Sequence, residues 1–528
     1  MKLTKVLYCL ILISALLSCN SNEESNLYVE FPYQKSIYLY ATDIDFSDTA
    51  LVLNKGNFIK WDGVSPLTWE TNEVRGGKYE IYLTVAIPNE LDGTNLILSY
   101  NGKENNFSLS ATKGPFKTRN YQRIKLPFSV ELRGGKQKIS LTATNVFADK
   151  TTMLFRSIEL LPLREKAAII VEQQRAIKSR SDISWFKKDG YGLMFHWTSE
   201  SVQQDGTLKK FEDAVNDFDV QKFADMVEET GANYVIFTIG HAESYCPAPI
   251  KNWEKIHPGH TTERDLIKEI ADALNQKDVR LFCYVNGPLA FKISKDYKSS
   301  EIEKMAFVNN FKNILGEMGA RYQQKIEGYW FDSWYQIFER FPKIPFEEFY
   351  NAAKTGNKNR IICLNSWVYP AVSPWQDYWA GEVASPIEIP ENGYMKDGPV
   401  SVLPYQALLI MEPYWVQQKA EMPEPLFKAD ELSKYIKDCM GNGGIVTINL
   451  GIYQDGALSM LVISCKTRME PELSEISMAT PLLMKVKLWL RKSRQAVLRR
   501  PLCMGKLLTE SDRLLATSGT MLMEPKRW

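Results

Sequence analysis

Over residues 184–458 short apolar runs alternate with segments of helical spacing, and this alternation constrains the fold more than any other feature. In one such segment Leu266, Ile270 and Leu274 recur at every fourth position, as on one face of a helix. Repeated strand, helix and strand predict a parallel sheet covered by helices. We therefore expect residues 184–458 to form one α/β domain.

Seven of the apolar runs in this region end in polar residues, which suggests where chemistry would gather. They are Tyr191–His196, Tyr234–His241, Arg280–Asn286, Tyr329–Asp332, Arg360–Asn365, a shorter run reaching Glu382, and Gly444–Asn449. These endings fit a (β/α)8 TIM-type barrel, whose functional residues lie at the carboxyl ends of its strands. A doubly wound sheet is the alternative, but the glycine-rich nucleotide-binding turn that it would need is missing.

Residues 28–163 have a different texture, with period-two alternation and glycine turns such as Arg75–Lys78 and Arg133–Lys136. This pattern predicts an all-β sandwich, and it loosely resembles the jelly-roll modules that accompany secreted glycosidases. Trp61 and Trp69 either line a glycan site, which would make this a carbohydrate-binding module, or fill the core. The charged residues 164–183 are predicted to form a helical connector to the barrel.

The two ends of the chain are unlike its body. Residues 1–19 have the basic start and short apolar core of a secretory signal, and they close at a lipobox-like Cys19. We expect a lipid anchor at Cys19, a polar tether over residues 20–27, and display on the outer membrane or cell surface of a Gram-negative bacterium, with an inward-facing anchor as the alternative. Residues 459–528 form an atypical tail, with neither Tyr nor Phe.

Charge and residue spacing argue against nucleic acid and a metal ion as partners. A net charge of +1 and the absence of long basic runs before the tail argue against nucleic acid. Six cysteines remain beyond Cys19, widely spaced, and we expect them to be buried thiols. His257 and His260 lie in a loop without a nearby carboxylate or thiol cluster, so no metal site is predicted.

The segment Gly328–Trp334 carries the strongest chemical signal, because it ends an apolar run with Asp332 between Trp330 and Trp334. A sugar-cleaving site needs aromatic walls for a pyranose ring and an ionised carboxylate beneath the anomeric carbon. The structural alternative is that Asp332 only caps the helix that follows it.

The motifs of the barrel region resemble those of glycoside hydrolase family 29, the α-L-fucosidases. The resemblance covers about residues 184–458. It rests on Trp185 with Tyr191–Trp197, on Phe218-Asp219 with Gly231–Tyr234, on Arg264–Leu266, on Gly328–Trp334, and on Thr447–Leu450 with Asp455-Gly456.

This resemblance implies a retaining exo-acting glycosidase, most similar to an α-L-fucosidase, that acts on oligosaccharide or polysaccharide and requires no cofactor. Asp332 would be the nucleophile and Glu382 the acid/base, with Glu412 and Glu388 as alternatives for the second role. A surface glycan-binding lipoprotein that has lost catalysis is the alternative function. The implied sugar contacts are His196, Trp197, His241, Asn286, Trp330, Trp334 and Trp379, and the histidines have a buried structural role as their alternative. The family's paired histidines appear here as His241-Ala242, which removes one polar anchor.

Overall fold

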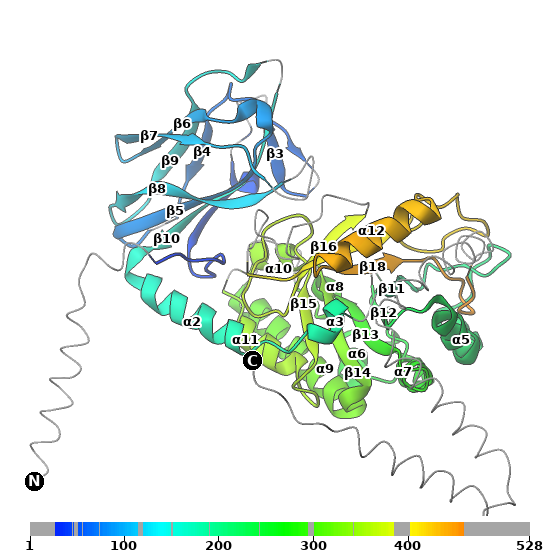
Figure 1. The fold of residues 1–528 in the computed structure, drawn as a ribbon. Coiled ribbons are helices and arrows are strands. Elements are labelled where there is room, and N and C mark those ends of the chain that lie inside the picture. Colours follow the sequence, from blue (N-terminus) through cyan, green and yellow to red (C-terminus); the bar gives the residue numbers. More distant parts are fainter. Residues whose placement is uncertain are drawn as a thin grey trace, which may run out of the picture. The chain divides into compact units, whose positions relative to one another are not determined.

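The structure is a computed structural model with two strand-rich parts (Figure 1). It describes residues 27–44, 46, 51–54, 56–72, 74–113, 120–148, 151–188, 191–241, 243–293, 300–341, 343–384 and 402–458. The predictions for the signal segment with Cys19, for Ala242, for Glu388 and for the tail from residue 459 lie outside these residues. Among the described helices, none is long and apolar enough to cross a bilayer.

The N-terminal part is a sandwich of two antiparallel sheets, as the alternation predicts. One sheet has the order β2-β3-β10-β5-β8, with β1 also paired to β10, and the other has the order β4-β9-β6-β7. The strands are β1 (Ile37–Tyr40), β2 (Leu53–Asn54), β3 (Phe58–Trp61), β4 (Leu67–Glu70), β5 (Gly77–Ala86), β6 (Thr94–Tyr100), β7 (Lys103–Leu109), β8 (Gln122–Leu132), β9 (Lys138–Ala143) and β10 (Met153–Pro162).

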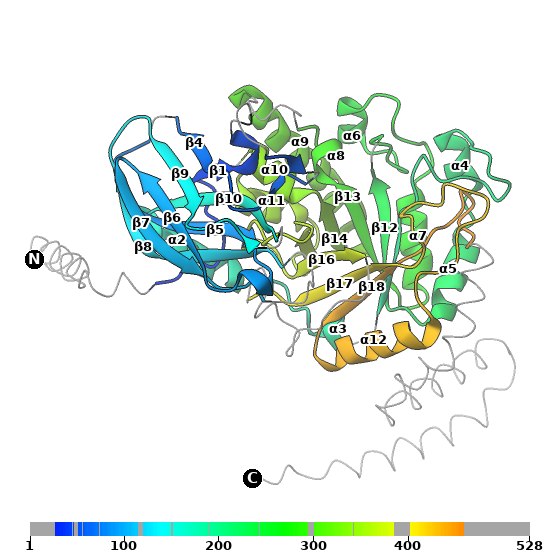
Figure 2. The same cartoon turned by 90° about the horizontal axis from the view of Figure 1, so that it is seen from above.

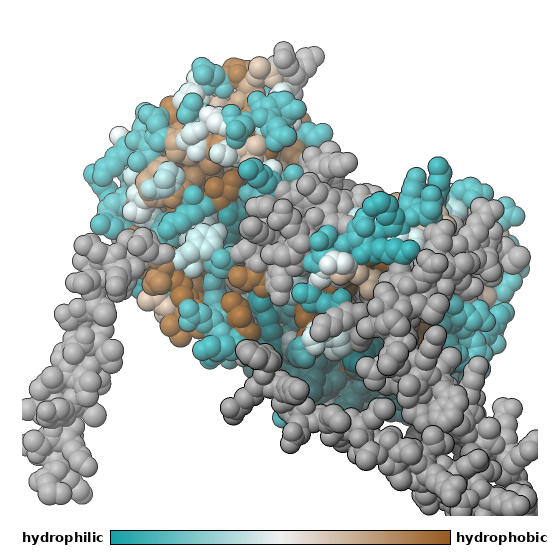
Figure 3. All heavy atoms as spheres, in the orientation of Figure 1, coloured by the Kyte–Doolittle hydropathy of each residue, from teal (hydrophilic) through white to brown (hydrophobic). Residues whose placement is uncertain are grey.

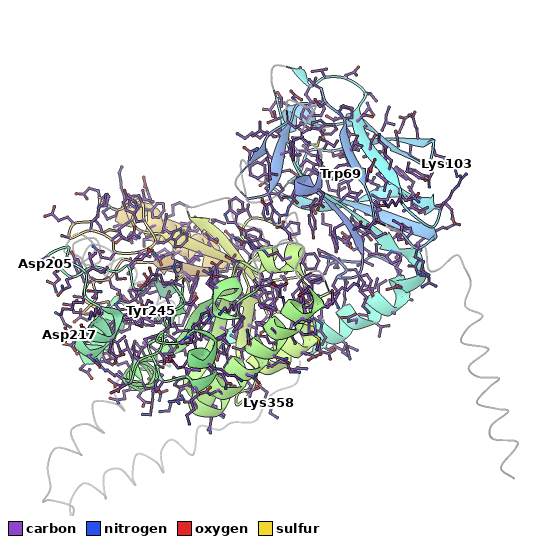
Figure 4. All side chains as sticks on the ribbon, turned by 180° about the vertical axis from the view of Figure 1, so that it is seen from behind. Trp69, Lys103, Asp205, Asp217, Tyr245 and Lys358 are labelled. Atoms are coloured by element: carbon purple, nitrogen blue, oxygen red, sulfur yellow. The ribbon has the colours of Figure 1, made fainter. Side chains whose placement is uncertain are left out.

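Apolar side chains of both sheets meet in one core. Trp61 of β3 and Trp69 of β4 are fully buried there, and the Trp69 ring lies 5.6 Å from that of Phe155 in the opposite sheet. Figure 4 shows Trp69 among the side chains of this part. Of the two alternatives for these tryptophans, the structure selects the core, so neither ring is exposed to a glycan. The α2 helix (Lys166–Lys178) then leads to the second part, where a connector was predicted.

The C-terminal part is an eight-stranded parallel sheet that nearly closes on itself. Its order is β15-β14-β13-β12-β11-β18-β17-β16, and the two ends of this order lie beside each other without a hydrogen-bonded ladder. The strands are β11 (Gly192–Phe195), β12 (Tyr234–Gly240), β13 (Arg280–Asn286), β14 (Ile326–Asp332), β15 (Ile361–Leu364), β16 (Trp379–Ala384), β17 (Tyr405–Ile410) and β18 (Ile445–Asn449). This is the predicted TIM-type barrel.

Helices lie outside the ring of strands, as the view from above shows for α5, α7 and α9 (Figure 2). The barrel helices are α3 (Ser184–Lys188), α4 (Phe211–Asp217), α5 (Val220–Thr230), α6 (Lys251–Ile256), α7 (Leu266–Asn275), α8 (Gly287–Ala290), α9 (Glu301–Tyr322), α10 (Trp334–Arg340), α11 (Phe346–Ala353) and α12 (Ala429–Gly441). The outward surface over α12 is mostly hydrophilic (Figure 3), and the apolar faces of α5 and α7 are buried.

Two features of the barrel differ from the pattern read in the sequence. The strand β17 was not among the seven predicted, and residues 365–378, which join β15 to β16, form no helix. This connection is nevertheless buried along almost its whole length. One of its side chains ties it to neighbouring segments, because Asp377 accepts hydrogen bonds from the backbone N–H groups of Ser181 and Ile362.

A buried ion pair joins the sandwich to the barrel. Arg156 of β10 pairs with Glu339 of α10, and both side chains are almost fully buried. Removing one partner from such a pair leaves an uncompensated charge away from water. We expect Arg156→Met to lower the free energy of unfolding by about 3–5 kcal/mol, measured by denaturant titration.

The matched control is Arg175→Met, which removes the exposed pair of α2 with Glu347 of α11. Its effect should stay below about 1 kcal/mol, since exposed pairs contribute little. The double variant Arg156→Met, Glu339→Met should recover most of the loss. Equal effects of Arg156→Met and Arg175→Met would contradict this account.

Candidate active site

The carboxyl ends of the barrel strands surround a cavity of about 380 Å³, a volume suited to a small ligand. Four polar residues among its walls stand at or just after strand ends: His196 after β11, His241 after β12, Asp332 ending β14, and Glu382 in β16. The remaining lining residues are Glu200, Tyr284, Trp330, Leu408, Pro413, Tyr414, Trp415, Val416 and Gln418. The predicted gathering of strand ends therefore brings two strand carboxyl groups, Asp332 and Glu382, into the wall of one cavity, and Glu200 adds a third from a loop.

Asp332 is held by hydrogen-bond donors on both of its oxygens. The Tyr284 hydroxyl donates to Oδ2 at 2.7 Å, and the Asn286 amide reaches the same oxygen at 3.3 Å. The backbone N–H of Ser333 donates to Oδ1 at 2.6 Å. Asn286 stands opposite Asp332 in the register of β13 and β14, which is why it reaches this carboxylate. These donors fix the position of the carboxylate.

Asn365, directly after β15, links the two carboxyl groups. Its Nδ2 donates to Asp332 Oδ1 at 2.8 Å and to Glu382 Oε2 at 2.8 Å. The two oxygens that share this amide group therefore lie no more than twice 2.8 Å apart. A cavity that contains this pair can place one carboxyl on each side of a scissile bond.

The two carboxyl groups have different environments. Burial, and then the negative charge of Asp332, raise the pKa of Glu382 to about 8, although the hydrogen bond from Asn365 opposes this. Glu382 is accordingly protonated at neutral pH, whereas Asp332 accepts four hydrogen bonds. One acid and one carboxylate side by side is the arrangement that general acid catalysis requires.

His196 is a neutral imidazole with a defined tautomer. Burial, reinforced by the neighbouring His241, lowers the pKa of His196 to about 3. The Asn449 amide donates to the Trp415 carbonyl oxygen, so its Oδ1 accepts from Nδ1 of His196 at 2.6 Å. Nδ1 carries the proton, and Nε2 is left as an acceptor for a hydroxyl group in the cavity.

His241 stands between the main cavity and a second, water-sized cavity of about 10 Å³. Burial lowers the pKa of His241, and its ring lies 5.7 Å from that of His196. Within the described part of the chain, neither Nδ1 of His241 nor Oγ1 of Thr238 has a hydrogen-bond partner, and both residues line the small cavity. His241 therefore has polar surroundings on two sides.

The other predicted sugar contacts fall into two groups. Trp330 is fully buried, but it borders the main cavity and stacks on Tyr284, with ring centroids 5.3 Å apart. Trp334 is fully buried against Phe349, and Trp379 is fully buried beside Tyr405. Trp197 is also buried, and its Nε1 donates to the Gln454 carbonyl oxygen at 3.2 Å. These three tryptophans lie outside the lining of the main cavity, in the surrounding core.

Several lining or linking residues were not among the predicted contacts, including Tyr284, Asn365, Glu200 and Trp415. Asn365 was visible as a polar strand end, and Trp415 follows the candidate Glu412. Tyr284 lies two residues before the end of β13, on the same side of the strand as Asn286, a position that period-two counting could have identified. Glu200 lies in a loop, and no sequence signal points to it.

Glu412, the alternative second carboxyl, is placed behind the wall of the cavity. It is fully buried, it is not a lining residue, and its Oε2 accepts from the backbone N–H of Gly451 at 3.4 Å. Burial raises the pKa of Glu412 to about 7, an effect that the Gly451 hydrogen bond partly offsets. Of the two candidates for the second carboxyl, Glu382 therefore lines the cavity and Glu412 does not.

The raised pKa of Glu412 predicts a pH-dependent stability. In the folded state Glu412 keeps its proton up to about pH 7, whereas in the unfolded state it releases the proton at about pH 4.5. The contribution of Glu412 to the free energy of unfolding therefore falls as pH rises from about 4.5 to about 7. Relative to wild type, Glu412→Gln should gain up to about 3 kcal/mol between pH 4.5 and pH 7.5 in denaturant titrations. A difference that stays constant with pH would contradict this.

The described residues hold no cluster of three or more potential metal ligands. His257 Nε2 lies 3.1 Å from the Ala290 carbonyl oxygen, and His260 Nδ1 lies 2.7 Å from that of Glu243. Each imidazole thus has a backbone partner. The four described cysteines, Cys246, Cys283, Cys363 and Cys439, are free and buried, as predicted.

Comparison with known proteins gives a family match over the barrel. Residues 208–465 match the family model described as Alpha-L-fucosidase. Similar solved structures include an α-L-fucosidase of Bacteroides thetaiotaomicron trapped as a covalent intermediate, with 18% identity over 56% of this chain and 75% of that one and a TM-score of 0.45. Another is the α-L-fucosidase AlfC of Lactobacillus casei with its fucose product, with 17% identity over 56% and 99% and a TM-score of 0.40. No curated protein matches the chain.

Proposed function

Because residues 208–465 carry an alpha-L-fucosidase family domain, we propose that this glycoside hydrolase is a retaining, exo-acting α-L-fucosidase, or a close relative for a sugar of similar stereochemistry. Its substrates are oligosaccharides or polysaccharides with a terminal sugar of this kind. The observation that carries the proposal is the pair Asp332 and Glu382, joined by the amide of Asn365 in the wall of one cavity. The bridged oxygens of the pair lie no more than twice 2.8 Å apart, which is compatible with retention, for which carboxyl groups lie about 5–5.5 Å apart.

In the first step the ionised Asp332 attacks the anomeric carbon while Glu382 gives its proton to the departing glycosidic oxygen. The bond to the leaving group breaks, and a covalent ester forms between the sugar and Asp332. Tyr284, Asn286 and Asn365 orient the carboxylate through their hydrogen bonds. Attack then starts from a fixed geometry, which lowers the entropic part of the barrier.

In the second step the same carboxyl group serves as a base. Ester formation removes the charge of Asp332, which is one of the two causes that raise the pKa of Glu382. The pKa of Glu382 therefore falls once the intermediate forms, and its carboxylate can take a proton from water. That water attacks the anomeric carbon, releases Asp332 and gives a product of retained configuration.

The neutral histidines and the aromatic rings provide recognition of the sugar. His196 Nε2 accepts from a sugar hydroxyl, and His241 and Glu200 add further polar groups to the wall of the cavity. Trp330 supplies an apolar surface for the ring. The residue after His241 is alanine here, where the family has a second histidine. We therefore expect the specificity among related sugars to differ from that of α-L-fucosidases.

The test is hydrolysis of aryl α-L-fucoside beside aryl glycosides of other sugars, followed by proton NMR of the first-formed anomer. The proposal predicts fucose release with the α anomer appearing first. Release of another sugar alone would place the change at His241-Ala242. Release of none, with oligosaccharide binding kept, would indicate a binding protein that has lost catalysis.

A further inference from the structure

Trp367 has an unusual position beside the carboxyl pair. All residues from 361 to 380 are buried except Trp367, which is partly exposed. Its backbone adopts a left-handed conformation with φ of 56°, which a bulky residue rarely does. The backbone N–H of Trp367 donates at 2.9 Å to Oδ1 of Asn365, the residue that links the two carboxyl groups. A strained, partly exposed tryptophan is thus fixed directly to the catalytic cluster.

A second partly exposed ring accompanies it. Tyr335 of α10 follows Asp332 by three residues, and its ring centroid lies 6.5 Å from that of Trp367, with the planes inclined by 36°. Tyr369 packs edge-on against Trp367 at 5.3 Å and against Tyr335 at 5.5 Å. Two rings, one after the carboxyl end of β14 and one after that of β15, therefore form a single aromatic pair.

The sandwich holds this pair in place. The Gly56 carbonyl oxygen, in the turn between β2 and β3, accepts from Arg156 Nη1 at 2.9 Å and from the Tyr369 hydroxyl. Gly56 has φ of 99°, and a Cβ there would approach Cζ3 of Trp367 to 3.0 Å. The Arg156 guanidinium lies 3.5 Å from the centre of the Tyr369 ring and 5.4 Å from that of Tyr335.

We propose that Tyr335 and Trp367 form a platform for the sugar ring of the leaving group, and that the sandwich fixes this platform through Gly56 and Arg156. The proposal rests on the proposed function, because only a glycosidase has a leaving group to place there. The acid Glu382 must touch the glycosidic oxygen, so the leaving sugar lies beside the residues that surround it. Aromatic faces bind the apolar faces of sugar rings, which suits the two partly exposed rings to this position.

The experiment compares two substrates that share the fucosyl group. One is a fucosyl-N-acetyllactosamine trisaccharide, whose leaving group contains sugar rings, and the other is α-L-fucosyl fluoride, whose leaving group contains none. Trp367→Ala should lower the ratio of kcat/KM for the trisaccharide to that for the fluoride about tenfold. Trp367→Phe should keep most of the ratio, because it retains an aromatic face. Gly56→Ala, a change in the sandwich, should also lower this ratio, because the added Cβ would approach Trp367.

Trp185→Ala is the matched control. It removes another partly exposed tryptophan, which packs on Arg280 where β13 begins, at the opposite end of the strand from Asn286. Its ratio should equal that of wild type. The contrary result is that Trp367→Ala lowers kcat/KM equally for both substrates, or for neither. Either outcome would show that the ring only packs between the sandwich and the barrel, and it would overturn the platform.

Failure of the proposed function gives a separate result. The wild type would then hydrolyse neither fucosyl substrate, and calorimetric titration with free N-acetyllactosamine takes the place of kinetics. Weaker binding by Trp367→Ala than by wild type and Trp185→Ala would support the platform. Equal binding by all three, or none by wild type, would overturn it.

Discussion

Asp332→Asn is expected to lower kcat for aryl α-L-fucosides by about 10³- to 10⁵-fold, because an amide cannot form the glycosyl ester. The substitution keeps the size of the side chain, and the Tyr284 hydroxyl and the Asn286 and Asn365 amides remain around it. The loss should therefore appear in kcat while the melting temperature changes little. The measurement is steady-state hydrolysis with sensitive detection of the released aryl group.

Asp217→Asn is the control for this variant. Asp217 ends α4 on the outside of the barrel, where its exposed carboxylate pairs with Lys209 (Figure 4). The same chemical change there should leave kcat within about twofold of wild type. If Asp332→Asn retained a tenth or more of wild-type kcat, a different group would have to be the nucleophile.

Glu382→Gln is expected to show the second large effect, a fall of about 10²- to 10⁴-fold in kcat on substrates whose leaving group needs a proton. The fall should be much smaller with fucosyl fluoride, since fluoride leaves without full protonation. The proposed mechanism needs Glu382 protonated, and the pKa of Glu382 is raised to about 8. Activity should therefore decline as pH rises through about 8, and this decline should vanish in Glu382→Gln.

The matched control for the pH profile is Glu412→Gln, which removes another buried carboxyl with a raised pKa. Because Glu412 does not line the cavity, its variant should keep the alkaline decline and most of the activity. The assignment would be wrong if the decline persisted in Glu382→Gln and disappeared in Glu412→Gln.

Most of the barrel could be predicted because its strands are apolar runs with polar ends. The missed strand, β17, shows why the rest could not. Gln406 interrupts its apolar run, yet it is fully buried and donates to the Thr447 hydroxyl of β18. A polar side chain satisfied by a neighbouring strand looks the same in the sequence as one exposed to water.

The site could be predicted in part for a similar reason. The strand ends identified Asp332, Glu382, His196 and His241, and all four line one cavity. The tryptophans were harder, because an aromatic residue beside a polar strand end serves equally well as a wall or as core. Trp330 points into the cavity two residues before Asp332, whereas Trp334 begins a helix and is buried by Phe346 and Phe349.

The role of Asn365 required the structure, because it depends on two distances at once. Its sequence position marks only a strand end. The amide reaches both Asp332 and Glu382 because β15 and β16 lie side by side without a ladder, where the barrel is not hydrogen-bonded. No pattern along the chain reports which two strands meet in this way.

The central claim is that Asp332 and Glu382 act as nucleophile and acid/base on a fucosyl substrate. The most direct measurement is the intact mass of the protein after incubation with 2-deoxy-2-fluoro-α-L-fucosyl fluoride, followed by peptide mapping. We predict one added 2-fluorofucosyl group, located on Asp332 and absent from Asp332→Asn. An unmodified protein, or a label on another residue, would contradict the account.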